Sequence, residues 1–305
     1  MELRSRGTYL LFRALAPAIA RVPEPVSAAV SAAVVAVIGR RDTTARRMAE
    51  RHLERVLASR SPAVAPDPAL VRRWARRSLQ EYGRYWLEAA RLPALDPAEV
   101  ARRIFVEEGY EHLEQGMAAG RGVVMALPHV GSWEWGGAFL AAKGYPMTTV
   151  AERLEPPELF EWFIAQRRAM GITVVPLDQA SSGTLLRTLR SGGLVGLLCE
   201  RDLTGTGVEV EFFGERTTFP AGPATLALRS GAVLVAAVVY RGPGRHHHGL
   251  VSAPLPTART GSLRGDVARL TQRLAEQFEL FIGRAPEQWH MFQPVWPGDR
   301  HAAGS

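Results

Sequence analysis

Two residues five positions apart carry the clearest chemical signal in the sequence. His129 follows the apolar segment RGVVMALP, and Glu134 lies in the segment GSWEWG directly after it. A carboxylate bonded to one ring nitrogen of a histidine fixes the tautomer and raises the basicity of the other nitrogen. Such a pair can act as a general base. The alternative is that Glu134 only supports the start of the following helix, while His129 packs on Trp133.

Further polar residues follow two other apolar segments. Glu152 comes directly after MTTVA, and Glu200, Arg201 and Asp202 follow LVGLLC. Parallel α/β sheets place their functional sites at the carboxyl ends of the strands. We therefore expect these residues to meet His129 at one edge of a sheet. Polar residues at strand ends also cap helices and satisfy backbone groups, so each one alone has a structural alternative.

Short apolar segments rich in valine and leucine alternate with helical patterns from residue 105 onward. The apolar segments are GVVMALPH, YPMTTVAE, GITVVPL, GLVGLLCE and AVLVAAVVY. Segments of this kind are typical of strands buried on both faces of a sheet. Helices are predicted at 132–143, 157–170, 181–191, 221–230 and 267–283. This alternation predicts an α/β fold with a mainly parallel central sheet covered by helices.

The first hundred residues have a helical pattern instead. Asp67 is placed as a helix N-cap, with Pro68 at the first helical position. Segments 4–25 and 26–39 are interpreted as two short helices lying against a bilayer; an ordinary amphipathic pair packed on the domain is the alternative. We divide the chain into a helical N-terminal membrane-associating region, residues 1–100, and one integrated α/β core, residues 101–305.

The charge of the chain favours an anionic partner. The net charge is +7 over 305 residues, and the isoelectric point is near 10.2. A membrane surface, a phosphorylated cofactor or nucleic acid would match this charge. A GC-rich genome would explain the preference for arginine, but not the excess of positive charge. Nucleic acid is disfavoured because the tryptophans cluster around His129 and in the helical segments, not among basic residues.

Several other chemistries lack their motifs. The sequence contains no G-x-S-x-G, no P-loop and no G-x-G-x-x-G after a strand. Cys199 is the only cysteine, which excludes an internal disulfide and favours a cytosolic setting. Because it lies in an apolar strand, we expect it to be buried and inert. Histidines 246–248 are assigned to a hairpin tip and not to a metal site, since consecutive histidines cannot all face one ion.

Three segments together resemble a known family. They are LPHVGSWEW, LCERDLTGTGVEVEFFGERTTFPAGPATLALRSGA and PEQWHMFQPVW, and they are similar to the lipid A biosynthesis (lauroyl/myristoyl) acyltransferase family. The resemblance runs from about residue 105 to residue 297. His129 and Glu134 match the family's hallmark of a histidine with an acid five positions later. Within the family, the sequence is most similar to the actinobacterial phosphatidylinositol mannoside acyltransferases.

The resemblance implies a reaction and a place for it. A long acyl chain, typically palmitoyl, would pass from acyl-CoA to a mannose hydroxyl of the glycolipid, at the cytoplasmic face of the cell membrane. The protein would be peripheral and would need no metal or redox cofactor. His129 would be the general base, without a covalent acyl-enzyme. Glu200 is preferred as its acidic partner, and Glu134 is second, because many relatives have the shorter aspartate at that position.

Substrate contacts also follow from the resemblance. Arg167, Arg168 and Arg201 would bind phosphates of CoA or of inositol; a role in surface solubility is the alternative for each of them. Glu152 is assigned to the acceptor hydroxyls and Asp202 to the substrate. Two other functions are kept open: acyl transfer to a lysophospholipid or another glycolipid, and lipid binding without catalysis.

Overall fold

The computed structural model describes residues 21–23, 25–26, 29–30, 33, 43–61 and 63–300, with only the backbone of Arg300. Most of the two N-terminal helices predicted to lie against a bilayer falls outside these residues. Among the helices that are described, none has both the length and the apolar character needed to cross a membrane.

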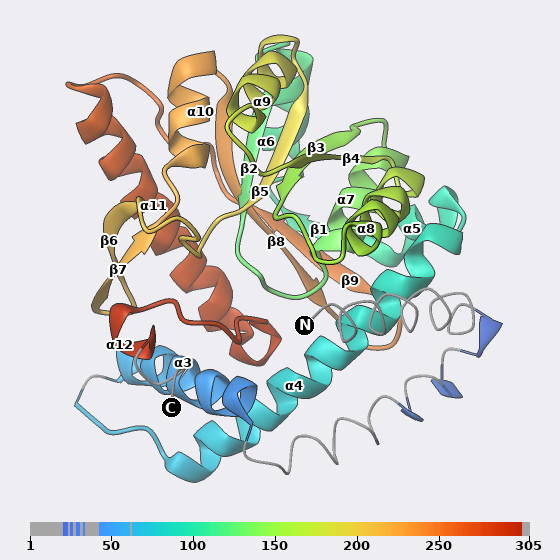
Figure 1. Cartoon of the computed structure of the whole chain (residues 1–305), viewed down its shortest axis with the longest axis vertical. Coiled ribbons are helices and arrows are strands. Elements are labelled where there is room, and N and C mark those ends of the chain that lie inside the picture. Colours follow the sequence, from blue (N-terminus) through green and yellow to red (C-terminus); the bar gives the residue numbers. More distant parts are fainter. Residues whose placement is uncertain are drawn as a thin grey trace.

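A seven-stranded sheet forms the centre of the described part of the chain, in the order β1-β9-β8-β2-β5-β3-β4. All neighbouring strands are parallel except β8 and β9. The predicted α/β fold with a mainly parallel sheet is therefore confirmed (Figure 1). The strands are β1 (Ile104–Glu108), β2 (Val123–Leu127), β3 (Met147–Ala151), β4 (Ile172–Pro176), β5 (Leu194–Leu198), β8 (Val233–Arg241) and β9 (His247–Val251).

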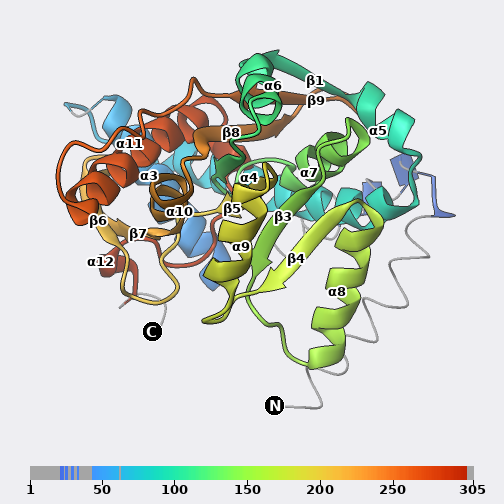
Figure 2. The same ribbon diagram turned by 90° about the horizontal axis from the view of Figure 1, so that it is seen from above.

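Two apolar layers cover the sheet, one on each face, and they bury its strands from both sides. Val124 and Ala126 of β2 belong to one core cluster, whereas Met125 and Leu127 belong to the other. The helices lie on either side of the sheet when it is seen from above (Figure 2). Helices α5 (Pro97–Arg103), α6 (Tyr110–Ala118), α7 (Trp133–Ala142) and α8 (Pro157–Ala169) are on the Met125 side; α9 (Ser181–Arg190), α10 (Gly222–Ser230) and α11 (Leu263–Arg284) are on the other side.

The remaining helices pack against the sheet edge where β2 and β5 end. Helix α3 (Thr44–Arg60) begins at the Thr43 cap, and α4 (Pro68–Arg91) begins at the Asp67 cap, whose side chain accepts from Ala69 N at 2.9 Å. Helix α4 runs along the sheet edge (Figure 1). Short helical turns complete the fold: η1 (Leu92–Ala94), η2 (Pro286–Gln288) and α12 (Pro297–Arg300).

A small antiparallel hairpin was not among the predicted elements. Strands β6 (Val208–Phe212) and β7 (Glu215–Phe219) pair with each other and not with the main sheet. Val210, Phe212 and Phe219 are buried in the same core cluster as α11, whereas the glutamates between them face outward. Histidines 246–248 do lie at a hairpin, that of β8 and β9, but only His246 is in its connection, because β9 begins at His247.

Candidate active site

The pairing of β2 with β5 brings His129 to Glu200. The two strands are parallel and in register from Val123–Leu194 to Leu127–Leu198, so the residues that follow them leave the sheet at the same edge. After His129 the chain turns at Gly131, whose φ is +63°. A Cβ atom there would lie 2.1 Å from the carbonyl oxygen of Val239, so only glycine fits this close approach.

Glu200 holds His129 by its ring and by its backbone. Ring Nδ1 lies 2.9 Å from both carboxylate oxygens, and the backbone N–H donates to Oε1 at 2.6 Å. The Glu200 side chain is fully buried, whereas 27% of the His129 side chain is exposed. None of the described residues forms a hydrogen bond with Nε2, so this nitrogen is available to a substrate. The carboxylate fixes the tautomer that keeps the lone pair on Nε2.

Trp289, which was assigned no role from the sequence, binds the same carboxylate. Trp289 Nε1 donates to Oε1 of Glu200 at 3.2 Å. The flanking backbone is joined to the histidine loop, because His290 N donates to His129 O and Gly131 N donates to Gln288 O. Burial raises the pKa of Glu200, but the charge and hydrogen bonds of His129 outweigh it and keep the pKa below its ordinary value. Glu200 is therefore an ionised partner for an imidazolium.

Among the described residues, Glu134 forms no hydrogen bond with His129, so the structure does not bear out the second candidate partner. Its carboxylate accepts from Arg167 Nε at 3.1 Å and from the Tyr85 hydroxyl at 3.3 Å. Both Glu134 and Arg167 are buried. In the first turn of α7 the Glu134 side chain faces α8, while the ring of Trp133 packs edge-on against that of His129 at 5.4 Å. The pair therefore joins two helices beneath the site.

The other predicted substrate contacts fall in different places. Glu152 and Arg201 form a long ion pair of 3.8 Å, both partly exposed. Asp202 accepts from the N–H groups of its own turn, including that of Gly207 at 2.8 Å, and so organises the loop after β5 instead of presenting a free carboxylate. Arg168 is exposed on α8, and Arg167 is committed to Glu134. The residues predicted to contact the substrates therefore do not form one cluster.

Two cavities flank the sheet near this edge. The first, about 70 Å³, is almost entirely apolar and lies between α7 and the sheet, with Trp133, Glu134 and Arg167 in its lining. The second, about 280 Å³, lies on the α9 and α10 side and is lined by Glu152 and Arg201, among others. Trp133 lines the first cavity and its ring packs against that of His129, so the apolar cavity is connected to the histidine through Trp133.

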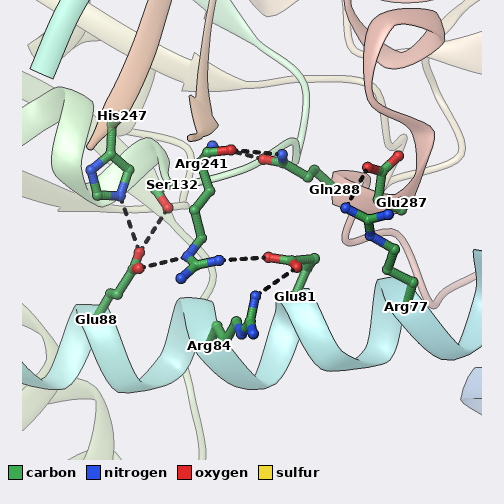
Figure 3. A network of polar contacts seen from close by, with 9 residues as sticks. All are labelled: Arg77, Glu81, Arg84, Glu88, Ser132, Arg241, His247, Glu287 and Gln288. Carbon is green, nitrogen blue, oxygen red and sulfur yellow. Dashed lines mark hydrogen bonds and ion pairs between the residues drawn. The ribbon is translucent and has the colours of Figure 1, made fainter. Parts of the chain in front are cut away.

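A polar network fastens α4 to the sheet edge beside the histidine loop (Figure 3). Glu88 accepts from Ser132 Oγ at 3.1 Å, from Arg241 Nε at 2.9 Å and from His247 Nε2 at 3.1 Å. Arg241 also reaches Glu81 on the same helix at 3.3 Å. Because Ser132 lies three residues after His129, the network sets the path of the loop that carries the histidine.

The comparisons with known proteins assign the chain to a family. Residues 2–297 match the bacterial lipid A biosynthesis acyltransferase family. The chain belongs to this family, which confirms the resemblance stated from the sequence, and it is therefore an acyltransferase by class.

Individual relatives are similar over most of the chain. A phosphatidylinositol mannoside acyltransferase of Mycobacterium tuberculosis (strain CDC 1551 / Oshkosh) is 41% identical over 256 residues, which is 82% of this chain and 76% of the relative. The protein of the same name from Mycolicibacterium smegmatis is 40% identical over 252 residues, 82% of this chain and 79% of the relative. A lipid A biosynthesis acyltransferase of Haemophilus influenzae is 27% identical over 184 residues, 59% of this chain and 55% of the relative.

Proposed function

We propose that this protein transfers a long acyl chain, palmitoyl in the first instance, from acyl-CoA to a mannose hydroxyl of a phosphatidylinositol mannoside. The observation that carries the reaction type is the partly exposed imidazole of His129 bonded to the buried carboxylate of Glu200. The acceptor is supported by the mycobacterial relatives, which are phosphatidylinositol mannoside acyltransferases by name.

The acyl group passes directly from the thioester to the acceptor, with His129 as the general base and no covalent acyl-enzyme. Nε2 takes the proton of the mannose hydroxyl as its oxygen attacks the thioester carbonyl carbon. Glu200 stabilises the imidazolium that forms, because its carboxylate accepts the Nδ1 hydrogen bond. The tetrahedral intermediate collapses by breaking the carbon–sulfur bond, and the proton on His129 neutralises the departing thiolate. General-base catalysis of this kind contributes about 10²–10⁴-fold to the rate.

The apolar cavity beneath α7 is our candidate for the acyl chain. Trp133 belongs to its lining and packs against the imidazole ring of His129. The lining includes Gly136 and Gly137, which leave room between the helix and the sheet. The open volume is about 70 Å³, so a full palmitoyl chain requires neighbouring side chains to move.

Both proposed substrates are amphiphiles, so the reaction is placed at a membrane surface. The net charge of +7 suits an anionic leaflet, and the cytoplasmic face supplies acyl-CoA. The protein is proposed to bind there as a peripheral protein. Exposed arginines on α4 supply positive charge for such contact; they are Arg72, Arg73, Arg76 and Arg77.

The deciding experiment measures free CoA released from palmitoyl-CoA in the presence of phosphatidylinositol mannoside, with mass spectrometry of the acylated product. We expect turnover by the wild type and a loss of at least about 10²-fold in His129→Ala. The exposed Arg264→Gln on α11 is the matched control. Full activity in a folded His129→Ala protein would remove the assigned base. Turnover with lysophospholipid but not with mannosylated acceptors would instead identify the alternative acyltransferase.

A further inference from the structure

Residues 288–291, named here the C-terminal strap, lie beside the histidine loop as an extended segment. Trp289 has an extended backbone, with φ −80° and ψ 107°, and forms an antiparallel bridge with Val130. Two backbone hydrogen bonds join the strap to the loop of His129, and the indole of Trp289 donates to Glu200. The strap is therefore attached to both residues of the proposed catalytic pair.

The opposite side of the strap is held by helices α3 and α4. Successive residues of an extended segment direct their backbone groups to alternate sides, so the carbonyls of Trp289 and Met291 face away from the histidine loop. Trp289 O accepts from Ser78 Oγ of α4 at 3.2 Å, and Met291 O lies 3.0 Å from Nδ1 of His52 on α3. Both Ser78 and His52 are only 1% exposed. The strap thus lies between the histidine loop and two buried side chains.

His52 is itself fixed in one orientation. Its Nε2 lies 3.1 Å from Oδ2 of Asp299, whose side chain is fully buried. A carbonyl and a carboxylate accept hydrogen bonds, so each ring nitrogen has an acceptor whenever it carries a proton. The ring also stacks on that of Trp289, with centroids 5.1 Å apart and an angle of 30° between the planes. His52 therefore contacts both the backbone of the strap and the aromatic ring that holds Glu200.

Helices α3 and α4 form a packed base for these contacts. Ala49 of α3 is buried together with Ala75 of α4, and Phe292, which directly follows the strap, packs against the same cluster. Figure 1 shows the C-terminal segment beside α3. Buried side chains on packed helices restrict the position of the backbone groups that they bind. A displaced strap would carry the Trp289 indole away from Glu200.

We propose that His52 is a positioning residue for acyl transfer, with Ser78 as a second one. The two side chains hold the strap where Trp289 donates to Glu200, and Glu200 in turn orients His129. Both act through the strap and not by touching a substrate. The proposal rests on the proposed function for the reaction that is measured, but the state of the His129 ring can be observed without any reaction.

The first test compares two replacements of His52 that have nearly the same size. His52→Leu removes both polar contacts of the ring, whereas the amide nitrogen of His52→Asn can take the place of Nδ1 and donate to Met291 O. Both variants lose the contact with Asp299 and the stacked ring. We expect kcat per folded enzyme to fall about tenfold in His52→Leu and to be largely restored in His52→Asn, with nearly unchanged KM for both substrates.

A second measurement follows the His129 ring in the absence of substrate. NMR of the whole protein labelled with ¹⁵N-histidine reports the Nδ1 hydrogen bond to Glu200, and the signals of His129 are identified by their absence from His129→Ala. We expect these signals to shift in His52→Leu and in Ser78→Ala, because both variants release one carbonyl of the strap.

Two variants on α3 are the matched controls. Arg51→Gln removes an ion pair of 3.5 Å to the other oxygen of Asp299, and Ser59→Ala removes a hydroxyl that bonds within its own helix. Both should keep the His129 signals and the kcat of the wild type.

Unmoved His129 signals and wild-type kcat in folded His52→Leu and Ser78→Ala, whatever the change in thermal unfolding, would show a purely structural role and overturn the proposal. If His52→Leu does not fold, Ser78→Ala decides in the same way, because it removes only one hydroxyl. Shifted signals in a protein whose wild type transfers no acyl group to any mannoside would keep the positioning role and remove the proposed function.

Discussion

Glu200 binds His129 at two points, the ring Nδ1 and the backbone N–H, from a position that is fully closed to solvent. Two points of attachment fix both the tautomer and the orientation of the ring. The histidine therefore has no rotational freedom to lose when a substrate reaches Nε2. Several predictions of the site's behaviour depend on this relationship and on the residues that support it.

Replacing Glu200 by glutamine should lower kcat by about 10²-fold or more, with a smaller effect on KM. The amide no longer stabilises an imidazolium, and it can favour the wrong ring tautomer. Steady-state kinetics of Glu200→Gln with palmitoyl-CoA and the mannoside measure the split. Glu152→Gln, a carboxylate change at the same sheet edge, is the comparison. A Glu200→Gln enzyme with wild-type kcat would exclude the carboxylate from catalysis.

Trp289→Phe tests the second support of Glu200. Phenylalanine keeps an aromatic ring in the same buried place but removes the N–H donor. We expect kcat to fall about tenfold, the worth of one hydrogen bond to a charged group. Steady-state kinetics of Trp289→Phe measure this loss, and a wild-type kcat would assign Trp289 to packing alone.

Glu134 and Arg167 should contribute more to the stability of the fold than to catalysis. Removing one partner of a buried ion pair leaves the other charge unpaired, which costs about 3–5 kcal/mol. Glu134→Gln should therefore show a much lower urea midpoint than the wild type. The double variant Glu134→Gln/Arg167→Met should recover a large part of the loss, since no buried charge remains. Equal midpoints for Glu134→Gln and wild type would mean that the pair is not needed for folding.

His290 makes the folded state sensitive to acid. Burial lowers its pKa to about 3 in the folded protein, against the ordinary histidine value of 6.5 that applies in the unfolded chain. The folded state therefore keeps the imidazole neutral, and its full stability is present above pH 6.5. As pH falls from 6.5 toward 3, the unfolded state binds the proton, and stability drops by about 1.4 kcal/mol per pH unit.

Chemical denaturation at pH 7.5 and at pH 5.5 measures this linkage. His52 is also buried with a lowered pKa and adds a loss of the same sign, so the comparison must be made between variants. The difference between wild type and His290→Phe isolates one histidine, and the variant should have the shallower pH dependence. Parallel curves for the two proteins would place the acid sensitivity elsewhere.

Gly137→Ala tests the cavity proposed for the acyl chain. The added methyl would lie 2.6 Å from Ile172 Cδ1 and 3.1 Å from Met147 Cε, both in the cavity lining, so it narrows the space. We expect the rate with palmitoyl-CoA relative to a short acyl-CoA to fall about tenfold, the typical worth of a methylene in an apolar pocket. Gly183→Ala on α9, with ordinary contacts at that position, is the control. An unchanged ratio of the two rates would mean that the acyl chain binds elsewhere.

The sequence was sufficient for the parts of the site that depend on strand order. His129 and Glu200 each follow a buried apolar strand, and parallel pairing of those strands carries both to one edge. Helix α11 was predicted from residue 267, but it begins at Leu263 because the Ser262 hydroxyl accepts from Gly265 N at 3.1 Å. Local periodicity thus locates a helix better than it locates the first turn.

Contacts between distant segments were not predictable in the same way. Glu134 was paired with His129 because they are near in sequence, but Arg167, on another helix, competes for the carboxylate. Trp289 had no assigned role because its partner lies 89 positions earlier in the chain. The β6–β7 hairpin was missed because its buried residues alternate with charged ones, and only packing on α11 shows which face is covered.

Helix α4 joins two different surfaces through one continuous rod of 24 residues, about 36 Å long. Its first half carries the exposed arginines 72, 73, 76 and 77, and its second half is tied by Glu81 and Glu88 to the strand that ends beside the histidine loop. A surface that binds those arginines is consequently held at a fixed distance and tilt relative to His129. Helix α4 would therefore act as a spacer that sets the distance between that surface and the hydroxyl to be acylated.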